Sequence, residues 1–286
     1  GMFYNVPVLR GRIPDKEYLD HFFYKRMGYR MDFENPVTYN EKLQWLTLHD
    51  HNPIYADFVD KNSAKRLVGE KIGFDHIIPT LGVYESFDEI DFNALPDKFI
   101  LKCTHDSGSV VICRDKESFD RNMARRKLTK SLARNWYMLG REWPYKNVPR
   151  RIIAEKYLEN SGSGEEVLTD YKFFCFDGEP KIVYVSKDKA REPHTDFFDM
   201  DFNHLPIRMQ DKNSDVPPSK PDKFEEMKRY AAILSAGIPH VRVDFYVVDS
   251  VVYFGELTFY HSCGCAPVHP AEWNKTLGDW IKLPKH

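Results

Sequence analysis

The chain has 286 residues, with 41 basic and 43 acidic side chains and a formal net charge of -2. This balance creates no global field for nucleic acid or an anionic membrane, so we expect neither as a partner. The length is sufficient to bury a large core and to form two or three subdomains. No apolar run approaches the roughly 20 residues of a membrane-spanning helix. The N-terminus also lacks the hydrophobic segment of a signal peptide, so we expect a cytoplasmic protein.

The cysteine pattern agrees with a reduced, cytoplasmic protein. The cysteines number five, and three of them lie in apolar stretches where a thiol acts as a small hydrophobe: Cys103, Cys113 and Cys175. The other two, Cys263 and Cys265, are separated by one residue and follow His261. Zinc sites usually have two residues between paired cysteines and a second, distant pair. We therefore expect a solvent-side loop at the mouth of a site here rather than a zinc site.

The first part of the chain, residues 1–58, is expected to be mostly helical. Residues 15–23 have the spacing of an amphipathic helix, and a second helix is expected from Asn40, a plausible N-cap. A third helix is expected to begin at Asp60-Lys61 and to end near Lys71.

Residues 72–154 alternate between strand and helix patterns. A strand is expected near Ile77-Ile78, and a hairpin is expected over residues 99–113. A basic helix follows from about residue 118 to 139. Its positive face fits either the solvated side of a mobile lid or a docking surface for an anionic glycan, and it contains Arg121, Arg125, Arg126, Lys127, Lys130 and Arg134.

The hairpin at residues 99–113 contains a single lysine, Lys102, in an otherwise apolar strand. Its neighbours Leu101 and Cys103 should face the opposite side of the strand. The loop that follows contains Ser107, Gly108 and Ser109, whose backbone N–H groups could bind the same phosphate as the Lys102 ammonium. No Gly-Lys-Ser/Thr follows, so the loop is not a Walker A motif. Ordinary hairpin chemistry explains the loop equally well.

The last part, residues 155–286, is expected to hold a larger sheet. Asp170 and Lys172 lie two residues apart in an aromatic strand, so they share one face, where they could also form a simple ion pair. The further elements are a strand over 151–158 that turns polar at Glu155, a Ser/Gly-rich turn over 160–166, an Asp177-Gly178 turn, a strand over 181–185, a Pro-rich loop over 214–222 and a helix over 223–235.

Two apolar runs between Val241 and Thr258 are expected to form a hairpin that turns at Asp249-Ser250. Asp244 lies in the first run and Glu256 in the second. An acidic residue in a buried strand is costly unless a cation pairs with it, and Arg242 shares a face with Asp244. Two carboxylates and a guanidinium on one sheet face suit Mg²⁺ with a phosphate, although a structural ion pair explains them as well.

Taken in order, these motifs resemble the ATP-grasp fold: a lysine strand, a small-residue loop, Glu-Lys-Tyr-Leu, Asp-x-Lys, Arg-x-Asp and Glu-x-Thr. The chain as a whole resembles the TupA-like ATP-grasp family, which is named after a teichuronopeptide-biosynthesis protein and is often found among bacterial surface-polysaccharide genes. The resemblance extends from about residue 35 to the C-terminus and is carried by residues 35–45, 59–61, 139–147, 170–176 and 254–260.

The resemblance implies an α+β ATP-grasp fold in which two α+β subdomains clasp ATP. It divides the chain into a helical N-terminal region, residues 1–58, a lid or central subdomain, residues 59–154, and a C-terminal subdomain, residues 155–286. The implied cofactors are ATP and one or two Mg²⁺ ions.

The resemblance also implies roles for individual residues. The nucleotide would be bound by a phosphate group of residues (Lys61, Lys102, Ser107, Gly108 and Ser109), an adenine hinge (Glu155, Lys156, Tyr157 and Leu158) and Asp170 near the ribose or phosphate. Arg242 and Lys172 would be catalytic, and the metal ligands would be Asp244, Glu256 and Thr258. Thr258 stands where many ATP-grasp enzymes have asparagine, which leaves the third ligand open. Ser109 stands where glycine is expected and implies a less mobile lid. Electrostatic compensation at a helix N-terminus would explain Lys61 as well.

The implied activity is ATP-dependent ligation of a carboxylate to an amine or similar nucleophile through an acyl phosphate, in the synthesis of a bacterial cell-envelope polysaccharide or peptide polymer. The substrates would be small molecules or glycans. Two other hypotheses stay open. One is a glycosyltransferase that uses Asp199 and Asp201 as a metal motif, and the other is a nucleotide-binding protein without catalytic activity. The sequence indicates neither the substrates nor the oligomeric state.

Overall fold

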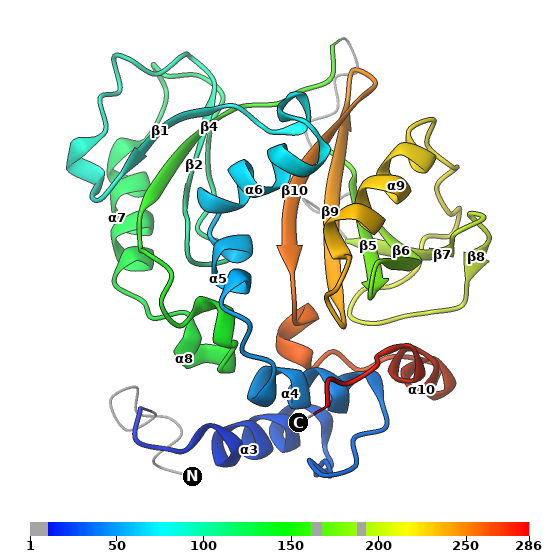
Figure 1. Cartoon of the computed structure of the whole chain (residues 1–286). Helices are drawn as coiled ribbons and strands as arrows, with labels where there is room; N and C mark the ends of the chain where they lie inside the picture. Colours follow the sequence, from blue (N-terminus) through cyan, green and yellow to red (C-terminus); the bar gives the residue numbers. More distant parts are fainter. Residues whose placement is uncertain (1–10, 162–167, 188–192, 286) are drawn as a thin grey trace.

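The computed structural model describes residues 11–161, 168–187 and 193–285. Within them the strands form two antiparallel sheets, with helices packed around both (Figure 1). The smaller sheet has the order β1-β4-β2-β3 and the larger has the order β10-β9-β5-β6-β7-β8. No helix in the described ranges has both the length and the apolar character needed to cross a membrane. Most of the Ser/Gly-rich turn predicted at 160–166 lies outside these ranges.

The smaller sheet contains the hairpin that was predicted around Lys102. Its strands are β1 (Thr80–Tyr84), β2 (Phe99–Cys103), β3 (Val111–Cys113) and β4 (Ile152–Lys156). In β2, Phe99, Leu101 and Cys103 are buried against helix α7 (Arg121–Leu132), whereas Lys102 lies on the opposite face and is half-buried. The predicted orientation of Lys102 is therefore confirmed.

The larger sheet places the predicted acidic hairpin at one edge. Its strands are β5 (Asp170–Phe176), β6 (Glu179–Lys187), β7 (His194–Asp199), β8 (His204–Leu205), β9 (Val241–Val248) and β10 (Val251–Thr258). Asp249 and Ser250 both have positive φ, 48° and 63°. This conformation matches the twist of a two-residue hairpin, so the predicted turn is confirmed.

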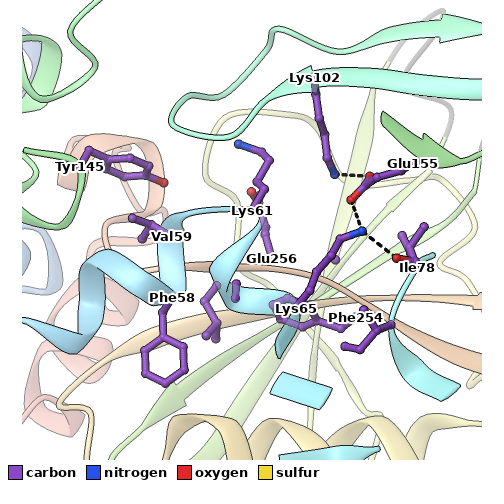
Figure 2. A pocket seen from close by; sticks show the side chains of 14 residues that line it. Phe58, Val59, Lys61, Lys65, Ile78, Lys102, Tyr145, Glu155, Phe254 and Glu256 are labelled. Atoms are coloured by element: carbon purple, nitrogen blue, oxygen red, sulfur yellow. Dashed lines mark hydrogen bonds and ion pairs between the residues drawn. The ribbon is translucent and has the colours of Figure 1, made fainter. Parts of the chain in front are cut away.

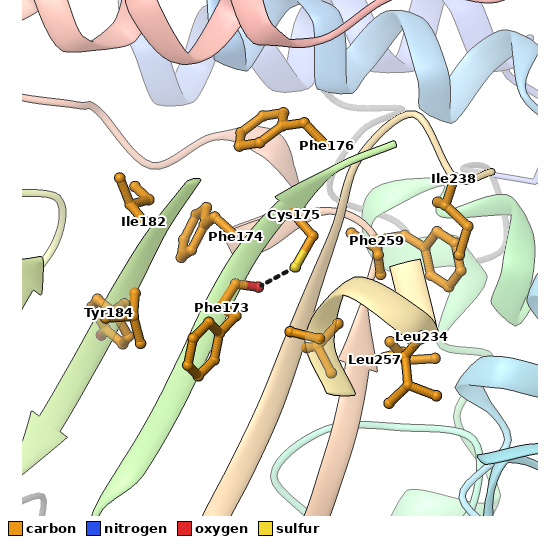
Figure 3. Close-up of a cluster of buried hydrophobic side chains, with 14 of the residues drawn as sticks. Phe173, Phe174, Cys175, Phe176, Ile182, Tyr184, Leu234, Ile238, Leu257 and Phe259 are labelled. Carbon is orange, nitrogen blue, oxygen red and sulfur yellow. Dashed lines mark hydrogen bonds between the residues drawn. The ribbon is translucent and has the colours of Figure 1, made fainter. Parts of the chain in front are cut away.

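Both faces of the larger sheet are covered, which explains why β5 is aromatic along much of its length. Phe173 packs against Phe224 of α9 (Phe224–Ser235) with ring centroids 5.6 Å apart. Phe174, on the other face, lies 6.3 Å from Tyr39 of α4 (Tyr39–His49). Figure 3 shows Phe173 and Phe174 within the core. The sheet is therefore a rigid platform for the polar side chains nearer the start of β5.

The remaining helices surround the sheets. They are α3 (Asp15–Met27), α5 (Ile54–Val59), α6 (Ser63–Ile72), α8 (Tyr137–Gly140) and α10 (Ala271–Trp280), with short 3-10 helices η1 (Phe74–His76), η2 (Phe87–Glu89), η3 (Trp143–Tyr145) and η4 (His261–Gly264). Helices α4 and α10 pack together, and Lys42 Nζ donates to the carbonyl oxygens of Gly278 and Ile281. A helix from the N-terminal part of the chain and one from the C-terminal part therefore pack together at the same end of the larger sheet (Figure 1).

Two predicted helix starts were wrong. Helix α4 begins with a capping box in which Thr38 Oγ1 accepts the Glu41 N–H and Glu41 accepts the Thr38 N–H. Asn40 is buried in the first turn instead, where its side-chain amide donates to the Gly264 and Ala266 carbonyls. The third helix, α6, begins at Ser63 rather than at Asp60-Lys61.

Two further predictions need correction. The strand expected near Ile77-Ile78 is displaced, because β1 begins at Thr80, and Ile77 instead forms a single bridge to Phe254 of β10. The long basic helix ends at Leu132, and the short helix α8 follows. The expected boundary between residues 154 and 155 falls inside β4, and the division into three regions stays a prediction.

Candidate nucleotide and metal site

A cavity of about 410 Å³ lies beside the exposed face of the small sheet. The four predicted hinge residues line it together, because β4 ends at Lys156 and the chain continues past the cavity. Apolar groups form the larger part of its lining, and polar and charged groups form the smaller part. Its lining includes Ile100, Val110, Ile112, Glu155, Lys156, Tyr157, Leu158, Asp170 and Tyr246. A pocket of this size with a few polar groups suits a drug-sized ligand such as a nucleoside.

One wall of this cavity is an ion-pair network centred on Glu155, which is 3% exposed. Lys102 Nζ lies 2.6 Å from Glu155 Oε2, and Lys65 Nζ lies 2.7 Å from Oε1 (Figure 2). Burial alone would raise the pKa of Glu155, but the two ammonium groups outweigh it and lower the pKa. The Glu155 carboxylate therefore pairs with two lysines, and its role in binding adenine stays a prediction.

Lys65 is a site residue that the sequence reasoning missed. It lies in the first turn of α6, four residues after Lys61, and its ammonium also donates to the Ile78 carbonyl at 2.6 Å. Burial lowers the pKa of Lys65 despite the neighbouring carboxylate. The spacing of four residues between the two lysines was the available signal, because such residues lie on the same side of a helix.

A second, smaller cavity adjoins the first and shares Ile78, Lys102 and Glu155 with it. Its volume is about 20 Å³, and its lining also includes Lys61, Tyr145 and Glu256. This is about the space of one water molecule. Two predicted phosphate-binding lysines, Lys61 and Lys102, therefore line the same small cavity.

Lys61 precedes helix α6 rather than starting it. Its backbone N–H donates to the Thr104 carbonyl at 3.1 Å, and its ammonium donates to the Asp106 carbonyl. Burial lowers the pKa of Lys61, although the charge of Glu256 opposes this shift. These contacts connect Lys61 to the small-residue loop that was predicted to bind phosphate.

In that loop, Ser109 is buried and its hydroxyl forms hydrogen bonds within the hairpin. Ser109 Oγ accepts the Cys103 N–H at 2.8 Å and donates to Asp106 Oδ1 at 2.6 Å. Ser107 and Gly108 form the exposed tip, and Gly108 has a positive φ of 86°. A phosphate-binding role for the tip stays a prediction, whereas the hydroxyl of Ser109 holds the loop in shape.

In the larger sheet, the hairpin brings the predicted catalytic and metal-binding residues together. Asp244 pairs with Glu256 across β9 and β10, and Arg242 pairs with Thr258. Arg242 binds Asp244 through two N–H groups, with Nε–Oδ1 and Nη2–Oδ2 distances of 2.7 Å. Lys172 Nζ lies 2.8 Å from Asp244 Oδ2 and 3.2 Å from Asp170 Oδ2.

The two predicted metal carboxylates have different environments. Asp244 is 2% exposed, whereas the side chain of Glu256 is 42% exposed. Burial would raise the pKa of Asp244, but Arg242 and Lys172 outweigh burial and lower it to about 2. Glu256 Oε1 lies 3.3 Å from Arg242 Nη2, which also donates to Thr258 Oγ1 at 3.0 Å. Both carboxylates are thus placed around one guanidinium.

Asp244 and Glu256 fit the carboxylate contribution that a protein usually makes to a Mg²⁺ site. Mg²⁺ is usually bound by one or two carboxylates together with substrate phosphates. Among the described residues no group of three or more His, Cys, Asp or Glu side chains could hold a metal by itself. Because the Thr258 hydroxyl accepts a hydrogen bond from Arg242, its role as a third ligand stays a prediction.

His261 stands behind Arg242 and was not assigned a role from the sequence. Its Nδ1 accepts a hydrogen bond from Arg242 Nη1 at 2.7 Å, and the ring is 5% exposed. Burial and the charge of Arg242 lower its pKa well below the usual value. His261 is therefore a neutral acceptor that orients the guanidinium.

The cysteine segment is not the solvent-side loop that the sequence predicted. Cys265 is buried, Cys263 is half-buried, and Gln44 Nε2 donates to the Cys263 carbonyl at 2.7 Å. Burial raises the pKa of Cys265 to about 12, which favours a protonated thiol rather than a metal ligand. Helix α4 packs against η4 and covers the segment.

The Asp-x-Asp triplet forms part of a turn. Asp199 Oδ1 accepts the backbone N–H groups of Asp201 at 2.9 Å and Asn203 at 2.8 Å. Strands β5 and β6 separate β7 from β9 in the sheet, so the triplet lies apart from Asp244. Nothing in this geometry favours the glycosyltransferase hypothesis.

The protein has the features of the ATP-grasp class: two antiparallel sheets, a nucleoside-sized cavity at a strand end, and a carboxylate pair beside an arginine. A family model described as TupA-like ATP-grasp matches residues 41–282. The chain belongs to this family, and the predicted α+β ATP-grasp fold is confirmed.

Solved structures of low sequence identity resemble the chain. The ATP-grasp ligase PsnB with a minimal precursor shares 10% identity, with a TM-score of 0.43 over 76% of this chain and 60% of that chain. PsnB with a phosphomimetic precursor variant, Mg and ADP shares 11% identity, with a TM-score of 0.46 over 84% and 67% of the two chains. D-alanine–D-alanine ligase from Bacillus anthracis with ATP shares 12% identity, with a TM-score of 0.42 over 92% and 72%. A comparison with curated proteins gives no match.

Proposed function

We propose that this protein is a Mg²⁺- and ATP-dependent ligase that joins a carboxylate to an amine or similar nucleophile. One observation carries the proposal: the Lys102–Glu155 pair forms a common wall between the nucleoside-sized cavity and the small cavity that reaches Glu256. A nucleotide with its base in the first cavity would direct its phosphates toward the second. Membership of the TupA-like ATP-grasp family supports this orientation.

The larger cavity would bind the adenine ring. Ile100 and Ile112 supply apolar contacts, and Tyr157 and Leu158 lie beyond the last ladder pair of β4, Phe99–Lys156. Backbone groups beyond the ladder are suited to hydrogen bonds with the edge of a base. Asp170, at the start of β5, lines the same cavity and is placed to contact the ribose or a phosphate.

The reaction would proceed in two steps. A carboxylate oxygen of the first substrate attacks the γ-phosphorus, an O–P bond forms, the bond to the β–γ bridging oxygen breaks and ADP leaves. The amine then attacks the acyl carbon, a C–N bond forms, the acyl C–O bond breaks, and phosphate and the amine proton leave.

The side chains of this chain would offset the charge of these steps. Arg242, Lys61 and Lys102 would bind phosphate oxygens whose charge increases in the transition state. Mg²⁺ bound by Asp244 and Glu256 would neutralise part of the charge on the β- and γ-phosphates. Lys172 would keep Asp244 ionised and in position.

The biological setting follows from the family resemblance. We propose that the substrates are small-molecule or glycan carboxylates and amines used in a bacterial cell-surface polysaccharide or peptide polymer. The exposed basic face of α7 would offer a docking surface to an anionic glycan. Screening ADP release against uronic acids, amino acids and amino sugars would identify the substrate pair.

Nucleotide selectivity tests the proposal. In the proposed site the hinge, Glu155 to Leu158, binds the adenine, and Arg242, Asp244 and Glu256 bind the phosphates and Mg²⁺. AMPPNP with Mg²⁺ should therefore raise the melting temperature more than UDP-glucose or GDP-mannose with Mg²⁺. At 100 times its Kd a ligand adds about 2.7 kcal/mol to the free energy of unfolding. Stabilisation by a sugar nucleotide and none by AMPPNP would contradict the ligase proposal and revive the glycosyltransferase hypothesis.

A further inference from the structure

Tyr145 lies in a segment whose conformation is fixed by local contacts. It ends η3, where its N–H donates to the Glu142 carbonyl at 3.1 Å, and the preceding Pro144 is buried. The Tyr145 ring lies edge-on to Trp136 with centroids 6.4 Å apart, and η3 packs against α5. The ring is therefore oriented before any ligand binds.

The hydroxyl of Tyr145 points into the small cavity. Figure 2 shows it directed toward Lys61 and Glu256. Within the part of the chain that the structure describes, this hydroxyl has no hydrogen-bond partner, although Lys102 and Glu155 line the same cavity. Tyr145 is half-buried, so its hydroxyl remains available to a ligand in the cavity. A ligand atom in the cavity would supply the missing partner.

The position of Tyr145 along the site indicates which part of a ligand it meets. The nucleoside-sized cavity and the small cavity share Lys102 and Glu155, but Tyr145 lines only the small one. A nucleotide with its base in the larger cavity and its phosphates directed toward the small one would have its base remote from Tyr145 and its terminal phosphate nearest to it. We infer that the Tyr145 hydroxyl donates a hydrogen bond to the γ-phosphoryl group, which makes Tyr145 a further catalytic residue. This inference rests on the function proposed above.

The surroundings of Tyr145 suit a hydrogen-bond donor that keeps its proton. Burial, followed by the negative charges of Glu142 and Glu256, raises the pKa of Tyr145 well above its ordinary value. The phenol thus stays neutral at physiological pH and transfers no proton in either step. A neutral donor aimed at the phosphoryl oxygens stabilises charge where it accumulates during transfer.

The test compares nucleotides with and without the γ-phosphate on the Tyr145→Phe variant, which keeps the ring and removes only the hydroxyl. Isothermal titration calorimetry with Mg²⁺ should show AMPPNP affinity reduced by about tenfold, the loss expected for one hydrogen bond to a charged group. ADP affinity and the melting temperature should match the wild type. Tyr137→Phe is the matched control, because the Tyr137 hydroxyl, in the preceding helix, binds Asp15 instead.

The possible outcomes separate the inference from the proposed function. Equal affinities of wild type and Tyr145→Phe for AMPPNP would overturn the inference and leave the ligase proposal intact. An equal loss for ADP and AMPPNP together with a lower melting temperature would show a structural role for the hydroxyl, which also overturns it. If the wild type binds neither nucleotide, the proposed function fails first and the inference with it.

Discussion

At the scale of single residues, Lys102 has two roles that the sequence did not separate. Its ammonium faces the predicted nucleotide cavity, and it also pairs with the buried carboxylate of Glu155. Lys65 holds the other oxygen of that carboxylate, so Glu155 keeps one partner when Lys102 is removed. Loss of Lys102 is therefore expected to affect the ligand more than the fold.

Lys102→Met keeps most of the side-chain volume and removes the charge. We expect AMPPNP binding to weaken by about 1.5–3 kcal/mol, the range for a hydrogen bond to a charged group, while adenosine binding changes little. Calorimetric titration of both ligands measures this difference. Lys98→Met is the control, because Lys98 pairs with the exposed Glu159 at 2.6 Å. Wild-type AMPPNP affinity in Lys102→Met would mean that Lys102 only holds Glu155.

At the scale of elements, the strands were more predictable from the sequence than the contacts between them. The two hairpins follow from local patterns, an apolar strand on each side of a polar turn. The roles of Lys65 and His261 depend on partners distant in sequence, Glu155 and Arg242, which no local pattern reveals. The cap of α4 was missed because Thr38 and Glu41 form a capping box that was not recognised.

The hairpin β9–β10 also shows how the structure distinguishes residues that look alike in sequence. Asp244 and Glu256 are both acidic residues in apolar strands, and the same role was predicted for both. Asp244 is buried between Arg242 and Lys172, whereas Glu256 is the more exposed of the two. The hairpin can therefore contain both a structural ion pair and a metal ligand. Asp244 contributes most to the ion pair, and Glu256 is the carboxylate more available to a metal.

Two nearly isosteric variants should separate these roles. Asp244→Asn leaves buried cations without their main partner, and we expect a loss of about 3–5 kcal/mol in the free energy of unfolding. Glu256→Gln should change that free energy by less than about 0.5 kcal/mol, as at a surface position, but should abolish the Mg²⁺-dependent part of AMPPNP binding. Urea unfolding and Mg²⁺ titrations on the same preparations measure both effects. Equal destabilisation with intact Mg²⁺ dependence would favour a purely structural pair.

At the scale of the whole molecule, the order of motifs along the chain was enough to predict the fold class. Several motifs that are far apart in sequence meet where the small sheet, helix α6 and the edge of the larger sheet approach one another (Figure 1). The bridge between Ile77 and Phe254 joins the segment before β1 directly to β10. Periodicity and turn residues do not specify this approach, because it depends on packing between distant elements.

The most direct test of the central claim is a crystal structure of the protein with AMPPNP and Mg²⁺. We expect the adenine beside Tyr157 and Leu158, with the phosphates passing Lys102. We also expect Mg²⁺ on Asp244 and Glu256, and the γ-phosphate within hydrogen-bond distance of Arg242 and Tyr145. A nucleotide bound away from the two cavities that share Lys102 and Glu155 would contradict the proposed site. So would a metal bound at Asp199 and Asp201 instead.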